Sequence, residues 1–391
     1  MKNKKIVFTF IVTSIVLVVL FFSILFIYDP LKIFHKPWIN KEYLQLNMRK
    51  QAAGIINNWE YDSVILGTSI LECTSSKEAS NKLGGKFINI SLAGSYFFER
   101  AIILKYLLKK KPIKKILYSL DNIGLIDTGK SDGTFKINSW SYLYDNNRLN
   151  DFKAYINNKY LKCLFSLSSK RKCFGKKVDV DRPNSWHKFP SQSIRFGGLD
   201  NWFKAKENPQ IKHAFSMILD SIQNIKKGQI PFDNNLVANI KASEKYINEN
   251  LIKYIKQYPN TEFILILPPY SRIKFAIDAQ YNKSSFERYK ASVRYLVSKS
   301  NKFSNLSIYG WGNHSFVDNI ANYKDPQHFE YKINSWMLNA IAREEGLLTS
   351  TNIDVYLDIF FNKSLNYDLY DLGNKINNYL NPIKPKKIKG Y

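Results

Sequence analysis

The fold is decided by the stretch Val64-Ile65-Leu66-Gly67-Thr68-Ser69. Aliphatic and β-branched residues dominate positions 62–66, which is typical of a central strand that is covered on both faces. Gly67 permits a sharp turn or a close backbone approach, and a helix is predicted at about 70–83. A serine at the carboxyl end of a parallel strand, beside a helix N-terminus, lies where open α/β sheets bind ligands. The alternative is a turn with a structural role only, because strand-Gly-x-Ser turns are common.

Strands and helices alternate on either side of this stretch. Four further apolar runs are predicted as strands, at 86–91, 114–120, 262–267 and 306–309. Helices are predicted at 43–57, 96–110, 235–258, 284–300 and 329–344. Alternating elements of this length indicate a parallel sheet of about five strands with helical crossovers. The alternation fails between about 126 and 231, and this segment is predicted as a large insertion or cap on the sheet.

The N-terminal region contains an apolar run, residues 6–28, of 23 residues without a charge. It is long enough to cross a bilayer as a helix. An uncleaved anchor is favoured over a signal peptide, because the run is long and no small-residue cleavage site follows it. Lys2, Lys4 and Lys5 precede the run, so the N-terminus is predicted to stay in the cytoplasm. The predicted parts are 1–30 (cytoplasmic stub and anchor), 31–348 (α/β domain) and 349–391 (C-terminal extension with a basic tail).

The chain has 58 Lys and Arg residues against 32 Asp and Glu residues, a formal net charge of +26. Such a charge is typical of proteins that bind nucleic acid and of proteins that face anionic lipid or an anionic surface polymer. The lysines are spread along the chain, so a solvated basic surface accounts for most of the charge. No nucleic-acid partner is expected, because a domain outside the cytoplasm has little access to one.

The cysteine and histidine patterns contain no metal or cofactor motif. The three cysteines, Cys73, Cys163 and Cys173, include no C-x-x-C pair, and no H-E-x-x-H or Gly-rich phosphate loop is present. We therefore expect no metal and no cofactor. Cys163 and Cys173 could form a disulfide outside the cytoplasm or remain free thiols. Cys73 falls in the helix predicted after Ser69, where a small buried side chain is the default.

The second stretch whose residues could take part in catalysis is Asp325-Pro326-Gln327-His328. A serine nucleophile needs a base within hydrogen-bond reach and a group that orients this base. The Asp325 carboxylate could accept the Nδ1 proton of His328 and leave Nε2 facing Ser69. The first and last strands of a parallel sheet can bring these residues to one rim. The alternative is a surface loop in which the Asp caps the next helix and the His is incidental.

Gly67-Thr68-Ser69 and Asp325-x-x-His328 resemble the first and last motif blocks of the SGNH (GDSL-like) hydrolase superfamily. The resemblance covers about residues 45–346 and implies a flavodoxin-like three-layer α/β/α sandwich. It implies that Ser69 is the nucleophile and that Asp325 and His328 complete the triad. The implied oxyanion hole contains the backbone N–H of Ser69, Gly94 of the second block and Asn122 of the third.

The third block departs from the family's pattern. It normally reads Gly-x-Asn-Asp, whereas this chain has Leu120-Asp121-Asn122. A negative Asp121 near an oxyanion would be unfavourable unless it points away or is paired with a lysine. This matters because the loss of one oxyanion donor costs on the order of 100- to 1000-fold in rate.

The anchor and the domain together resemble envelope members of this superfamily, such as the membrane-anchored proteins of D-alanyl transfer to teichoic acids and the acetyltransferase-like proteins of alginate export. This implies an extracytoplasmic serine esterase or O-acyltransferase that acts on a cell-envelope polysaccharide or a similar polymer. The implied setting is a single pass through a bacterial inner or cell membrane, with a multi-span membrane acyltransferase as a potential partner. The alternative is a non-catalytic module that binds polysaccharide or docks on an acyltransferase. The irregular third block, the basic surface and the aromatic-rich insertion (Trp140, Trp186 and Trp202) favour this alternative.

Overall fold

The computed structural model describes residues 2–38, 43–45, 47–121, 123, 136–168, 170–177, 181–182 and 186–382. Five parallel strands form its central sheet: β2 (Ser63–Leu66), β3 (Phe87–Asn89), β4 (Lys115–Ser119), β6 (Glu262–Leu267) and β7 (Leu306–Gly310). Their order across the sheet is β3-β2-β4-β6-β7. The predicted parallel sheet is confirmed, and this strand order is that of flavodoxin-like folds.

Each strand contributes to two cores, one on each face of the sheet, because successive side chains of a strand point to opposite faces. Leu66 and Tyr118 belong to the first core, whereas Ile65 and Leu117 belong to the second. All four side chains are buried, as the continuous apolar runs of central strands require.

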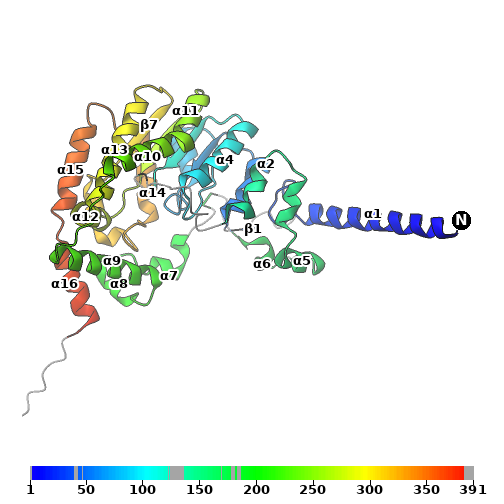
Figure 1. The fold of residues 1–391 in the computed structure, drawn as a ribbon, viewed down its shortest axis with the longest axis horizontal. Helices are drawn as coiled ribbons and strands as arrows, with labels where there is room; N and C mark the ends of the chain where they lie inside the picture. The colour runs from blue at the N-terminus through cyan, green and yellow to red at the C-terminus, as the bar shows by residue number, and fades with distance from the viewer. Residues whose placement is uncertain are drawn as a thin grey trace, which may run out of the picture.

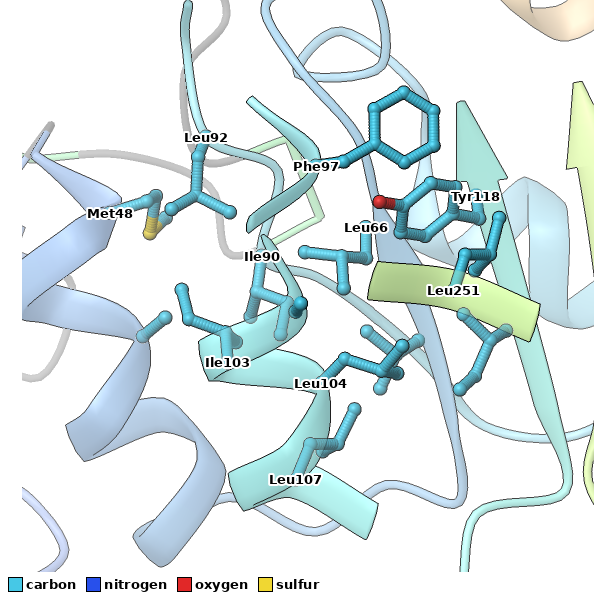
Figure 2. Close-up of a cluster of buried hydrophobic side chains, with 14 of the residues drawn as sticks. Met48, Leu66, Ile90, Leu92, Phe97, Ile103, Leu104, Leu107, Tyr118 and Leu251 are labelled. Atoms are coloured by element: carbon cyan, nitrogen blue, oxygen red, sulfur yellow. The ribbon is translucent and has the colours of Figure 1, made fainter. Parts of the chain in front are cut away.

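Helices cover both faces and complete a three-layer α/β arrangement. The first core is covered by α2 (Met48–Asn58), α4 (Phe97–Lys110), α10 (Leu236–Ile247), the π-helical segment Asn248–Ile252, α11 (Lys253–Gln257), α13 (Lys283–Ser300) and α15 (Ile353–Leu365). Figure 2 shows part of this core, where Ile103, Leu104 and Leu107 of α4 lie beside Leu66 and Tyr118. The second core is covered by α3 (Ser76–Leu83), α9 (Pro209–Lys226), α12 (Arg272–Gln280), α14 (Tyr331–Ala342) and α16 (Leu369–Leu380).

The helix predicted at 70–83 begins later than expected. Residues 70–74 form turns, and α3 starts at Ser76 with Ser75 Oγ accepting the N–H of Glu78 at 3.0 Å. The amide of Asn89 on β3 donates to the carbonyls of Leu71 and Thr74 at 2.8 and 2.9 Å. These carbonyls therefore have a distant partner, and that of Leu71 also accepts the N–H of Thr74 in a turn at 2.9 Å, so neither belongs to an α-helix. Cys73 consequently lies outside the helix, although it is buried as expected.

The helix predicted at 43–57 also starts late, at Met48, after the N-cap Asn47. Tyr43–Leu44 instead forms β1, which pairs antiparallel with β5 (Lys176–Lys177) of the insertion. The sequence signal for a helix here was overridden by pairing with a segment that lies more than a hundred positions away.

The described part of the insertion predicted at 126–231 contains several short helices and turns, a disulfide and one long helix, α9. Its helical elements are α5 (Asn158–Phe165), α6 (Arg171–Phe174), α7 (Pro190–Ser193), α8 (Leu199–Lys204), α9 and short 3-10 turns at Ile137–Ser139, Ser141–Tyr144, Asn150–Ala154 and Trp186–Lys188. Cys163 and Cys173 are joined by the disulfide. The three tryptophans of the insertion are buried (Trp140, Trp186 and Trp202). They form no exposed aromatic surface of the kind that would favour a polysaccharide-binding module.

The residues after 348 are part of the folded body as far as residue 382. Phe360 of α15 is fully buried in the first core, and Ile376 of α16 is fully buried in the second. Two more 3-10 turns, Ser315–Asp318 and Ile320–Asn322, lie between β7 and α14. The basic tail predicted at the C-terminus lies outside the described residues.

Helix α1 (Lys2–Tyr28) projects away from this body (Figure 1). Among the described residues it is the one helix that is long and apolar enough to cross a membrane, by length and composition. Its side chains are exposed over most of its length, and only its last turns pack on the domain, where Leu25 and Tyr28 are buried.

Candidate active site

Ser69 lies on a tight turn at the carboxyl end of β2. A Cβ atom at Gly67 would come within 2.5 Å of Ser119 Oγ, so the close approach of β2 and β4 here requires glycine. Two hydroxyls hold the turn, because Ser91 Oγ accepts the N–H of Gly67 at 3.1 Å and Ser119 Oγ accepts that of Thr68 at 3.3 Å. The turn is thus fixed by both neighbouring strands.

The structure brings together the three residues of the predicted triad. Ser69 Oγ lies 2.9 Å from His328 Nε2. On the other side of the ring, His328 Nδ1 lies 2.8 and 2.9 Å from the two carboxylate oxygens of Asp325. Asp325 Oδ1 also accepts the backbone N–H groups of Gln327 and His328, both at 3.0 Å. Asp325 therefore bonds both the backbone and the side chain of His328, and these bonds orient the imidazole ring toward Ser69.

The charge of Asp325 is stabilised where it is buried. Burial alone would raise the pKa of this carboxyl, but His328, the cation of Lys324 and the N–H of Gln327 together hold the pKa well below its usual range. Asp325 is therefore an anion at neutral pH and can balance a proton on His328 during a reaction.

Lys324 was not recognised from the sequence. Its ammonium lies 3.9 Å from Asp325 Oδ2 and 4.2 Å from the ring centre of Trp186, and it donates to Gln192 Oε1 at 2.6 Å. Burial lowers the pKa of Lys324 to about 8, and the nearby Asp325 carboxylate opposes this shift. No local motif marks this lysine, because two of its contacts come from the insertion.

The candidate oxyanion site lies beside Ser69 in a pocket of about 240 Å³. Gly94 lines this pocket and has a φ of +60°, which glycine adopts without strain. Among the described residues, the backbone N–H groups of Ser69 and Gly94 donate no hydrogen bond within the chain. Both remain available to a ligand. Asn122, the predicted third donor, lies outside the described residues.

Ser95 supplies a hydroxyl that the sequence did not indicate. It is 3% exposed and lines the same pocket, and its Oγ has no hydrogen-bond partner among the described residues. A buried hydroxyl without a partner costs free energy, on the order of 1–3 kcal/mol. A ligand oxygen in the pocket is the partner that would remove this cost.

Asp121 also lines the pocket, and it is engaged by several groups. It accepts hydrogen bonds from Ser119 and, at 2.9 Å, from the hydroxyl of Tyr270. Arg100 lies 3.8 Å from its Oδ2. The charge of Asp121 is therefore paired with a cation, which is an arginine on α4 and not the lysine considered from the sequence.

The insertion forms one side of the site. The indole N–H of Trp186 donates to the carbonyl of Ser69 at 3.1 Å, and its ring meets that of His328 nearly edge-on, with centroids 5.7 Å apart. The neighbouring His187 stacks on Tyr331 at 4.5 Å, and burial lowers its pKa to about 4. These tryptophan contacts join segments too distant in sequence for a motif to reveal them.

Within the described part of the chain, no group of three or more His, Cys, Asp or Glu side chains is placed to hold a metal ion. No family model, curated protein or solved structure matches this chain at a significant level. The resemblance to the SGNH superfamily thus remains a prediction from the motif residues. Chemically, the arrangement combines a hydroxyl, a basic nitrogen within hydrogen-bond reach, a carboxylate that orients the ring, and backbone N–H donors beside a pocket.

Proposed function

We propose that this protein is a membrane-anchored serine esterase or O-acyltransferase of the SGNH type. The observation that carries the proposal is the continuous hydrogen-bonded path from Ser69 Oγ through the His328 ring to Asp325. The Ser69 end of this path lies at a pocket that Gly94 also lines, and among the described residues the backbone N–H groups of Ser69 and Gly94 donate no hydrogen bond within the chain.

The proposed reaction has two steps. Ser69 Oγ attacks the acyl carbonyl while His328 Nε2 takes its proton, and the N–H groups of Ser69 and Gly94 stabilise the oxyanion. The intermediate collapses when His328 returns the proton to the departing alcohol, which leaves an ester on Ser69. Water or an acceptor hydroxyl then attacks this ester by the same route and restores the serine.

The pocket favours a short acyl group. Its volume of about 240 Å³ is below the range for drug-sized ligands, roughly 300–1,000 Å³. Polar groups line much of it, among them Asp121, Tyr270 and Gln327. An acetyl or similarly small group therefore suits the site better than a fatty acyl chain.

The proposed setting is outside the cytoplasm, with α1 as a single membrane pass. Lysines precede the apolar helix, and the Cys163–Cys173 disulfide is of a kind that persists in oxidising compartments. An acylated cell-envelope polymer is the substrate class that this location and the family resemblance support. The three tryptophans of the insertion, which motivated the non-catalytic alternative, are buried and therefore offer no surface to a polysaccharide.

The test uses the full-length protein in detergent with a fluorophosphonate probe and p-nitrophenyl esters. Wild type should be labelled at Ser69 and should cleave the acetate faster than the palmitate, whereas Ser69→Ala should lose both reactions. Ser298→Ala, at an exposed hydroxyl on α13, is the matched control and should behave as wild type. Equal labelling of wild type and Ser69→Ala would exclude Ser69 as the nucleophile.

A further inference from the structure

Three large apolar side chains are exposed around the base of α1. Trp38, Phe165 and Leu167 are 58, 79 and 72% exposed, and we call them the collar. Transfer of such a side chain from water to an apolar environment is favourable. Exposed apolar groups gathered at one place mark an interaction surface.

The collar lies at the height of the last turns of α1. The Tyr28 hydroxyl donates to the carbonyl of Ser168, which follows Leu167. The ring of Trp38 lies 6.4 Å from that of Phe26, which, like Tyr28, belongs to α1. Figure 1 shows α5 and α6 beside the C-terminal end of α1, where this helix joins the domain.

The length of α1 places the edge of a bilayer at the same height. A bilayer's hydrocarbon core takes about 20 helical residues. The last charged residue before the apolar run is Lys5, so a span that begins at Ile6 reaches the far edge near Leu25. Leu25 is also the first buried residue of α1, one turn after Phe22, whose ring lies 4.9 Å from that of Phe152 on the domain. The collar therefore meets the zone of the lipid headgroups.

The Leu167 backbone is strained, and its side chain is left in solvent. Its φ is +42°, a region that is unfavourable for a residue with a Cβ atom. The turn is held by the N–H of Ser168, which donates to the carbonyl of Cys163 at 3.0 Å, and Cys163 is in turn bonded to Cys173. Within the described residues, the turn thus presents Leu167 outward.

Charge identifies the partner as an anionic surface. The segment 152–178 contains eight Lys and Arg residues and no Asp or Glu. Lys162 and Phe165 are three residues apart on α5 and both are exposed, so a cation and an apolar group share one face. This pairing is typical of segments that lie in the headgroup region of a membrane with anionic lipids.

We propose that the collar inserts into the extracytoplasmic headgroup region of the bilayer that α1 crosses, and that it binds anionic lipid. The inference rests on the membrane anchoring contained in the proposed function. Two attachments, α1 and the collar, would fix the tilt of the α/β domain on the membrane.

The test measures the depth of single fluorescent labels in full-length protein reconstituted into nanodiscs of phosphatidylcholine and phosphatidylglycerol. Surface cysteines can be labelled selectively, because Cys163 and Cys173 are bonded and Cys73 is buried. An NBD label is placed at Leu167→Cys, at Val18→Cys in the middle of α1, and at Val237→Cys on α10. Val237 is 69% exposed and serves as the matched solvent control.

Quenching by doxyl-labelled lipids should place the label at residue 167 about 5–10 Å into the headgroup and acyl boundary. The label at residue 18 should be quenched most by deep doxyl groups, and the label at 237 should not be quenched. If the label at residue 18 is quenched but the label at 167, like that at 237, is not, the collar faces another partner. This result overturns the inference and leaves the anchoring by α1 intact. Lack of quenching at residue 18 overturns the anchoring and the inference together.

Discussion

The indole N–H of Trp186 donates to the backbone carbonyl of Ser69 at 3.1 Å. This bond ties the insertion to the turn that carries the candidate nucleophile. The same indole ring lies beneath the ammonium of Lys324, at 4.2 Å, and meets His328 edge-on. One side chain of the insertion thus touches the turn, the base and the cation beside the orienting carboxylate, which makes the insertion part of the site.

Trp186→Phe should lower kcat/KM for p-nitrophenyl acetate by roughly 3- to 10-fold, since a net hydrogen bond is worth about 0.5–1.5 kcal/mol. Phenylalanine keeps an aromatic ring against His328 but cannot bond the carbonyl of Ser69. Trp311→Phe is the matched control, because Trp311 is also buried and donates to a backbone carbonyl, that of Glu345, at 3.0 Å. Equal kcat/KM losses in the two variants would mean that the Trp186 bond acts on general stability only.

Ser95→Ala should separate activity from stability. If the Ser95 hydroxyl completes the oxyanion site, its removal should lower kcat on the order of 100-fold. The melting temperature should stay the same or rise, because the variant removes a buried hydroxyl that has no partner among the described residues. Steady-state kinetics and thermal unfolding of the same preparations check both parts. A wild-type kcat in the variant would show that the Ser95 hydroxyl is not part of the oxyanion site.

The strands and the triad were predictable because their signals are local. A buried apolar run that ends in Gly67, and an Asp three positions before His328, each carry their information within a few residues. The meeting of Ser69 and His328 then follows from the parallel arrangement, since the carboxyl ends of all five strands lie on one rim.

The errors and omissions have non-local causes. The helix predicted from residue 70 begins only at Ser76, because side chains from β3 and α14 donate hydrogen bonds to the carbonyls before it. The Asn334 amide, for example, donates to the carbonyl of Ile70 at 3.0 Å. Lys324 and Trp186 were missed because their partners lie in segments far apart in sequence. A pattern read along one segment cannot contain such contacts.

Lys324 should make stability rise with pH in the alkaline range. Its pKa in the folded protein is about 8, whereas an unfolded lysine titrates near 10.4. Between these values the unfolded chain holds one proton more. The contribution of Lys324 to the free energy of unfolding therefore rises by up to about 1.4 kcal/mol per pH unit.

Urea unfolding of wild type and Lys324→Met at neutral and alkaline pH isolates this contribution. The free energy of unfolding of wild type minus that of the variant should increase with pH. Lys245→Met is the control, because the Lys245 side chain is 77% exposed and its substitution should give a difference that changes little over the same range. A Lys324 difference that is flat or falls with pH would contradict a lowered pKa.

Loss of the Cys163–Cys173 disulfide should loosen the α5–α6 segment without disturbing the sheet. The bond closes a short loop, with a sequence separation of 10, for which the chain-entropy model gives about 2–3 kcal/mol. Hydrogen exchange of the full-length protein, measured with and without reductant, should therefore show faster exchange in peptides of 158–174. Peptides that contain β2 and β4 should keep their protection. The Cys163→Ser/Cys173→Ser variant should match the reduced protein and should not respond to reductant, which controls for effects on Cys73. Faster exchange across the sheet as well would show that the disulfide stabilises the whole α/β body, because the insertion and the sheet would then unfold as one unit.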